Sequence, residues 1–245
     1  MTTRPNRVKR RGVTASGLAS TALLLVACAS SPPAPDWQAN AYAALNSFSS
    51  AYLNGNTRLA DFEFARARSE ISSTGRVDLM ARAELARCAV RVASLEFDNC
   101  ATYQALAPDA HVREQAYAAY LTGQWQGLDP ALLPAQHRAI VTHAQAQKPT
   151  GASAPTPQVL STIEDPLARL VAAGVLLQSK RLTPPDMATA TETASSQGWR
   201  RPLLAWLGVQ LQRANDAADR DAAMRIQRRI DLVLQEKSKN PSTNQ

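Results

Sequence analysis

Hydrophobic residues along most of the chain recur every three or four positions, which is the spacing of one face of an α-helix. In the first half the pattern predicts helices over residues 37–53, 57–72, 77–95, 98–107 and 109–122. Each of these segments ends at a helix stop signal such as Asn54-Gly55-Asn56 or Ser73-Thr74-Gly75, and Asp36 is placed to cap the first helix. No alternating strand pattern of useful length occurs, so the sequence predicts an all-α fold.

The second half continues the helical pattern after an interruption. Helices are predicted over residues 133–147, 165–179, 184–197, 201–214 and 217–236, with a short one starting at Pro157. Asp165 is placed to cap its helix and Pro166 to occupy the first turn. The stretch KPTGASAPTP at residues 148–157 is typical of a linker. We therefore expect an N-terminal helical lobe over 36–147, a C-terminal helical lobe over 158–236 and a disordered tail over 237–245.

One helical pattern repeats at a fixed distance. Leu170, Ala173, Gly174 and Leu177 recur 34 residues later as Leu204, Leu207, Gly208 and Leu211. Similar rows are Leu45, Phe48, Ser49 and Tyr52, followed by Ala60, Phe64 and Ala67, and a third is Leu85, Cys88, Ala89 and Val92. A period of 34 residues resembles the tetratricopeptide repeat family. The resemblance implies an array of antiparallel helical hairpins, a tetratricopeptide-like α-solenoid, in which Gly174 and Gly208 face the second helix of their own hairpins.

The alternative architecture is an irregular helical bundle. The same spacing marks one face of any amphipathic helix, and the usual Trp, Tyr and Pro positions of the family are mostly unfilled. The predicted turns also differ in length, and the register is lost between about residues 109 and 165.

The first 28 residues have the composition of an export signal. A basic start, with arginines at positions 4, 7, 10 and 11, precedes an uncharged run over residues 13–27 that is too short for a comfortable membrane span. Leu25-Val26-Ala27-Cys28 resembles the lipobox of bacterial lipoproteins. The resemblance implies cleavage after residue 27, lipidation of Cys28 and, because Ala29 follows the cysteine in place of aspartate, anchoring on the periplasmic face of the outer membrane. Residues 28–35, rich in Ser and Pro, would then form a tether to the folded domain.

Removing the signal changes the charge of the chain. The whole sequence has 27 Lys and Arg against 20 Asp and Glu, but residues 1–27 hold five of the basic residues and none of the acidic ones, which leaves 22 against 20, or +2. A mature chain this close to neutral has no global field for nucleic acid, so we expect no nucleic-acid partner. Only four Phe and four Trp occur.

Two cysteines remain after lipidation, Cys88 and Cys100. An even pair in an oxidising periplasm predicts a disulfide that closes a short loop. Two free buried thiols or one reactive cysteine are the alternatives, although no CxxC motif marks redox chemistry.

Motifs of catalysis are missing from the sequence, including GxSxG, HExxH, SxxK, Walker and GxGxxG patterns. His137 and His143 are six residues apart, which places them on different faces of a helix, so we predict neither metal nor cofactor. Glu63, Glu70 and Glu84 lie on predicted helices, where solvent-facing ion pairs are expected. Trp125, between Gly123 and Gly127, is either a contact residue or a loop side chain folded back into the core; Trp199 has the same two interpretations.

These features together predict a lipid-anchored scaffold or adaptor that binds another envelope protein during envelope biogenesis. The alternatives are a peptidoglycan-active hydrolase or transglycosylase, and a purely structural envelope lipoprotein. A cleft with a lone buried glutamate would favour the enzyme, whereas an apolar groove without ionisable groups would favour the adaptor.

Overall fold

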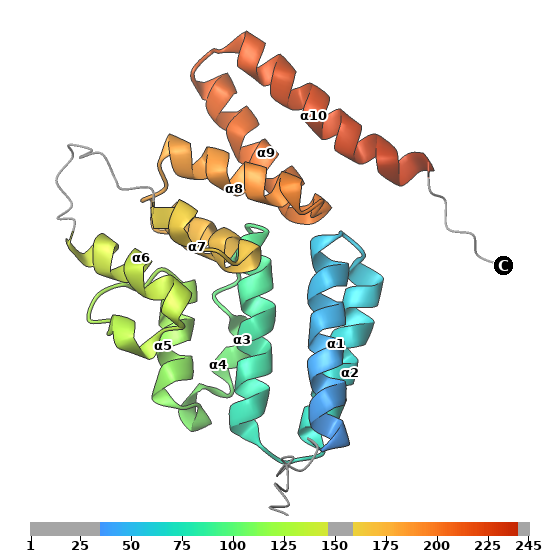
Figure 1. Ribbon diagram of the computed structural model, residues 1–245, viewed down its shortest axis with the longest axis vertical. Helices are drawn as coiled ribbons and strands as arrows, with labels where there is room; N and C mark the ends of the chain where they lie inside the picture. The colour runs from blue at the N-terminus through green and yellow to red at the C-terminus, as the bar shows by residue number, and fades with distance from the viewer. Residues whose placement is uncertain (1–34, 147–158, 240–245) are drawn as a thin grey trace, which may run out of the picture. The chain divides into compact units, whose positions relative to one another are not determined.

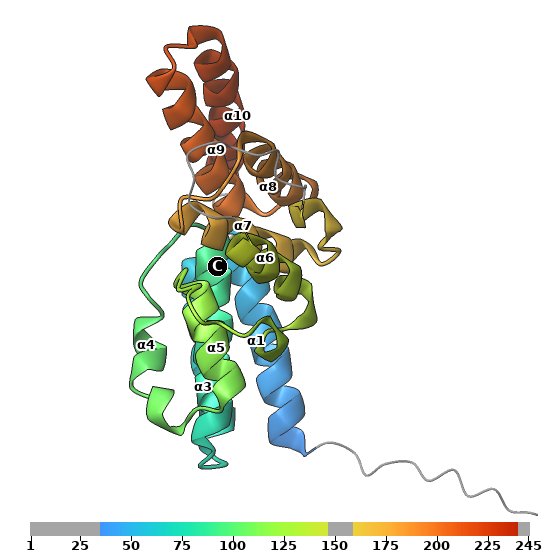
Figure 2. The ribbon, with the colours of Figure 1, turned by 90° about the vertical axis from the view of Figure 1, so that its left-hand side faces the viewer.

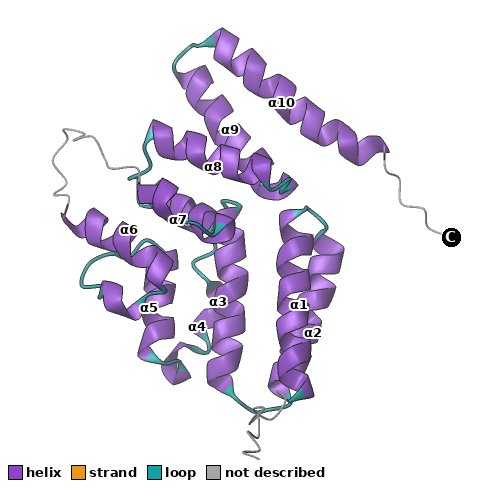
Figure 3. Cartoon of the chain, in the orientation of Figure 1, coloured by secondary structure: helices purple, strands orange, loops and turns teal. Residues whose placement is uncertain are grey.

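The computed structural model describes residues 35–146 and 159–239, and all regular structure in these ranges is helical (Figures 1 and 3). The α-helices are α1 (Asp36–Leu53), α2 (Thr57–Ser72), α3 (Val77–Ala93), α4 (Ala101–Gln104), α5 (Val112–Leu121), α6 (Ala135–Ala146), α7 (Pro166–Gln178), α8 (Pro184–Ser196), α9 (Arg200–Asp216) and α10 (Arg220–Lys239). Three 3₁₀ turns, η1 (Ala107–Asp109), η2 (Pro130–Leu132) and η3 (Val159–Thr162), lie between them. The predicted all-α class is confirmed. Cys28, the signal and all but the last residue of the tether lie outside the described residues, as does the linker.

Local chemistry sets several helix starts where the sequence places them. The Asp165 side chain accepts a hydrogen bond from the Ala168 amide at 2.6 Å, and Pro166 opens α7. Thr183 and Asp186 form a reciprocal capping box at the start of α8. The expectation for Asp36 is wrong, because Pro35 occupies the capping position and Asp36 lies in the first turn of α1. Its carboxylate there is favoured by the partial positive charge of the helix N-terminus.

The first two helices form a hairpin (Figure 1). The rings of Phe48 and Phe64 lie 5.1 Å apart between them, and Ala44, Ala60 and Ala67 are fully buried. These small side chains allow the two helices to approach closely, while the aromatic pair fills the remaining space.

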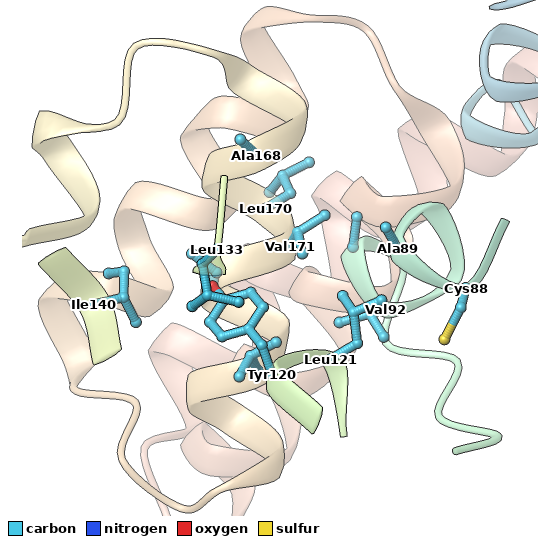
Figure 4. Packing of buried hydrophobic residues seen from close by; sticks show 14 of the residues in the cluster. Cys88, Ala89, Val92, Tyr120, Leu121, Leu133, Ile140, Ala168, Leu170 and Val171 are labelled. Carbon is cyan, nitrogen blue, oxygen red and sulfur yellow. The ribbon is translucent and has the colours of Figure 1, made fainter. Parts of the chain in front are cut away.

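A close crossing joins α3 to α7, which are far apart in the sequence. At the crossing, a methyl group on Gly174 would overlap the carbonyl oxygen of Val92 and lie 2.9 Å from its Cγ1 atom. Only glycine therefore allows the two backbones to come this near. Leu170 and Val171 of α7 and Ala89 of α3 are buried around the same contact (Figure 4).

One core continues through both expected lobes. Buried side chains from Ala81 on α3 to Leu207 on α9 form a single cluster, to which α5, α6, α7 and α8 also contribute. In Figure 4, Tyr120 and Leu133 lie beside Leu170 and Val171. The described parts of the two lobes accordingly belong to one compact unit.

The glycine part of the repeat hypothesis is wrong. Gly174 faces α3 instead of α8, the next helix along the chain, and Gly208 is exposed with no atom within 4 Å of the position where a Cβ would stand. The two glycines are therefore not equivalent. The physical reason is that a spacing of three and four residues marks an apolar helix face but does not specify which neighbour covers it.

Cys88 and Cys100 form a disulfide, with their Cα atoms 5.3 Å apart, as the sequence predicted. The bond ties α3 to the residue just before α4. Asn99 and Cys100 have positive φ angles of 53° and 51°, which are incompatible with a right-handed helix. The predicted helix over 98–107 is consequently reduced to α4 and the separate turn η1.

Arg201 connects three parts of the described chain. Its Nε donates to the Tyr52 carbonyl oxygen at 2.8 Å, and its Nη1 and Nη2 donate to Glu96 Oε1 at 3.1 Å and Thr57 Oγ1 at 2.7 Å. The guanidinium also lies 4.1 Å from the centroid of the Tyr52 ring. The start of α9 is thereby fixed to the α1–α2 turn and to the segment after α3.

The two glycines give a matched pair of substitutions with opposite expected signs. Gly174→Ala should destabilise the protein by roughly 1–3 kcal/mol, because the new methyl group forces the α3 and α7 backbones apart. Gly208→Ala should stabilise it by roughly 0.5–1 kcal/mol, because alanine is the better helix former and the site is open. Urea unfolding of both variants and the wild type tests this. Equal effects of the two substitutions would contradict the crossing.

Candidate functional site

A groove of about 660 Å³ opens among α1, α3, α5, α6 and α7, whose positions are shown in Figures 1 and 2. Its volume lies within the range of sites that hold one small ligand or a few side chains of a partner. The lining residues are contributed mainly by α3 and by the segment from η2 into α6. The groove is thus assembled from elements that the α3–α7 crossing and the common core hold together.

The floor of the groove is apolar. Ala86, Ala89 and Val90 come from α3, and Leu167 and Val171 come from the first turns of α7. Ala86 and Ala89 stand three residues apart and so share one face of α3. Because their side chains are single methyl groups, this face leaves space that larger residues would fill.

Ionisable side chains surround the apolar floor: Arg82, Arg113, Arg138, Glu114 and Asp165. Arg82 Nε donates to Glu114 Oε1 at 2.6 Å, which links α3 to α5. Asp165 already accepts the Ala168 amide as the cap of α7. Each lining carboxylate therefore makes a hydrogen bond within the protein through one of its oxygens.

Two of the three arginines have no acidic partner. Arg138 Nε donates to the Leu133 carbonyl oxygen at 2.9 Å, and its side chain makes no ion pair in the described ranges. Arg113 is exposed at the start of α5 and has neither a hydrogen bond nor an ion pair within the part of the chain that the structure describes. The groove thus offers uncompensated positive charge.

A buried aromatic cluster joins α5 to α6 and contributes Tyr117 and His137 to the groove lining. Tyr120 Oη and His137 Nδ1 lie 3.1 Å apart, a hydrogen bond whose donor depends on the histidine tautomer. The His137 ring is 1% exposed and stacks on Tyr117, with 5.8 Å between ring centroids. Burial lowers the pKa of His137 to about 4, against the smaller opposing effect of the Asp165 charge. Burial likewise raises the pKa of Tyr120, so the pair is neutral near pH 7.

Buried carboxylates elsewhere are also paired. Glu84 accepts from Thr102 Oγ1 at 2.6 Å and pairs with Arg68 at 3.2 Å. Glu63 pairs with Arg66 at 2.9 Å. The expectation that Glu63 and Glu84 face solvent is wrong, because both are buried and neutralised by an arginine on α2. In the described ranges, the groove holds no pair of unengaged carboxylates of the kind that general acid–base hydrolysis requires.

Trp125 and Trp199, the remaining candidate contact residues, pack in or against the core. Trp125 is 9% exposed and packs edge-on to Tyr120, at 5.9 Å between ring centroids, so its interpretation as a contact residue is wrong and the core interpretation holds. Trp199 is partly buried against the core. Among residues 35–146 and 159–239, no cluster of His, Cys, Asp and Glu could hold a metal. No helix in the same ranges has the length and apolar character needed to cross a bilayer.

Sequence reasoning missed the groove itself. Arg82, Arg113 and Arg138 come from three helices and read individually as exposed surface charges. The signal that could have drawn attention to α3 is its run of small residues, Ala83, Ala86 and Ala89, but this pattern equally predicts close helix packing.

The buried histidine predicts an acid-sensitive fold. The folded-state pKa of His137, about 4, lies below its ordinary value of 6.5, so protons bind the unfolded chain more tightly. The corresponding stability is complete above pH 6.5 and is lost as the pH falls through 4, by up to about 3 kcal/mol. His137→Gln should flatten this part of the curve of unfolding free energy against pH, measured by urea unfolding. Equal slopes for wild type and His137→Gln would contradict the assignment.

Comparison with known proteins places the chain in no family. No family model, no curated protein and no solved structure matches it.

Proposed function

We propose that the chain is a lipid-anchored adaptor of the bacterial cell envelope whose helical domain binds a segment of another envelope protein in the groove. The observation that carries the proposal is the groove's chemistry: an apolar floor beside two arginines that lack acidic partners. Such a surface can bury apolar side chains of a partner and orient them through charge. The groove is not the purely apolar surface expected of an adaptor, and it contains one buried glutamate, Glu114. Because Glu114 is paired with Arg82, its state supports binding over hydrolysis.

The membrane anchor in this proposal is supported by the sequence alone. Leu25-Val26-Ala27-Cys28 follows a basic, then apolar, leader, and the Ser- and Pro-rich residues 29–35 provide a spacer. Acyl chains on Cys28 would hold the chain at the periplasmic face of the outer membrane, because more than one chain gives stable anchoring. The groove would then be presented to proteins of the periplasm and of the membrane.

The anchor has a direct test. Cys28→Ala, expressed as the full chain in a Gram-negative host, should not be lipidated and should leave the outer-membrane fraction. Mass spectrometry of the mature N-terminus and membrane flotation measure the two effects. A wild-type chain that carries no lipid, or a Cys28→Ala variant that floats like the wild type, would contradict the anchor.

The binding function is tested by site-specific photo-crosslinking in the same host. A photoreactive residue at Gln136, an exposed position in the groove lining, should yield a discrete crosslinked envelope protein. Ala86→Phe should abolish the product, because Ala86 is only partly buried and the larger ring fills the floor without replacing a fully buried residue. The same photoreactive residue at the exposed Gln235 on α10 is the control. A product that survives Ala86→Phe, or no product from Gln136, would contradict the proposal.

A further inference from the structure

We infer that the segment bound in the groove is an acidic, apolar peptide: a stretch of a partner protein in which apolar side chains alternate with Asp or Glu. This inference rests on the proposed adaptor function and adds the chemistry of its partner.

The charges of the lining favour an acidic partner. Within the lining, Glu114 is paired with Arg82, and Asp165 accepts the Ala168 amide as the cap of α7. Three arginines thus stand against two carboxylates, an excess of one positive charge. Arg113 and Arg138 stand on α5 and α6 without ion pairs in the described ranges. Guanidinium groups match the two oxygens of a carboxylate, so an acidic side chain is the natural counterpart. A basic segment would meet uncompensated repulsion at both positions.

The fixed position of Arg138 favours the same kind of partner. Arg138 is not a freely moving charge, because its Nε bond to the Leu133 carbonyl oxygen ties the side chain to the segment that enters α6. A guanidinium held in this way loses less entropy when it binds a carboxylate. Leu133 and Pro134, next to it, belong to the apolar lining, so apolar and acidic contacts adjoin each other.

The polar groups of the lining favour a peptide over a fatty acid, which would also combine an apolar chain with an acidic group. The Glu114 carboxylate, which is paired with Arg82, is one polar group of the lining. Ser49 and Gln136 add further polar groups to the lining. Peptide N–H and C=O groups can satisfy such atoms, whereas a hydrocarbon chain would leave them buried and unpaired.

The test is selection from a displayed library of short random peptides against the full mature chain in detergent. Peptides that bind should be enriched in Asp and Glu together with Leu, Ile or Phe, relative to the unselected library. Arg113→Glu should weaken the selected peptides on the order of tenfold, and adding Arg138→Glu should weaken them further. Arg113→Glu removes no bond within the described part of the protein, so the melting temperature should not change.

Arg225→Glu with Arg228→Glu on α10 makes the same change of net charge at exposed positions outside the groove and should leave binding intact. Ala86→Phe decides whether selected peptides occupy the groove. Peptides that are neutral or basic yet lose binding in Ala86→Phe would overturn the acidic partner and leave the adaptor function standing. Absence of any peptide whose binding depends on Ala86 would overturn both. Oleate that binds in an Ala86-dependent manner, when no peptide does, would replace the peptide with an acyl ligand.

Discussion

The close approach of α3 and α7 at Val92 and Gly174 is the constraint on which the rest of the structure depends. These helices belong to the two halves of the sequence, and their contact lies in the middle of the common core. A helix carrying any side chain at position 174 would be held away from the Val92 carbonyl, and the residues beside it would lose contacts on both sides. One glycine therefore determines how closely α7 approaches α3. The same distance sets the positions of the apolar residues from both helices that line the groove.

The groove results from the small side chains of α3. Alanines on α3 allow neighbouring helices to approach on one face, and on the face toward α1 and α6 the same residue type leaves space. Charges then gather at the edge of this space because their long side chains reach water beyond the apolar floor. The Arg82–Glu114 pair has a structural effect too, since it links α3 to α5 where a buried, unpaired carboxylate would be costly.

Local signals in the sequence predicted local structure well. Asp165 and Pro166 act through atoms within three residues of themselves, so the sequence predicted the start of α7. The disulfide was readable because the chain offers only two cysteines once the first is assigned to the lipid. The sequence did not show which helix packs on which face. Gly174 and Gly208 share the same spacing of apolar neighbours, yet the first lies against the α3 backbone and the second is exposed to water. The burial of Trp125 could not be predicted from the sequence either, because its packing against Tyr120 exists only in the assembled core. The groove arginines were unpredictable for the further reason that their proximity exists only after three helices have packed.

Arg201 has a consequence for how the chain reaches this structure. Its bond to the Tyr52 carbonyl oxygen spans 149 residues of sequence, so the α1–α2 hairpin acquires this partner only when α9 is present. Closing so long a stretch of chain carries an entropic cost that short-range helix pairing does not. The first hairpin can form from local contacts early in synthesis, but its attachment to the C-terminal helices is a late step. A chain interrupted before α9 would carry a formed hairpin in which the Tyr52 carbonyl oxygen accepts the Gly55 amide but lacks the Arg201 side chain.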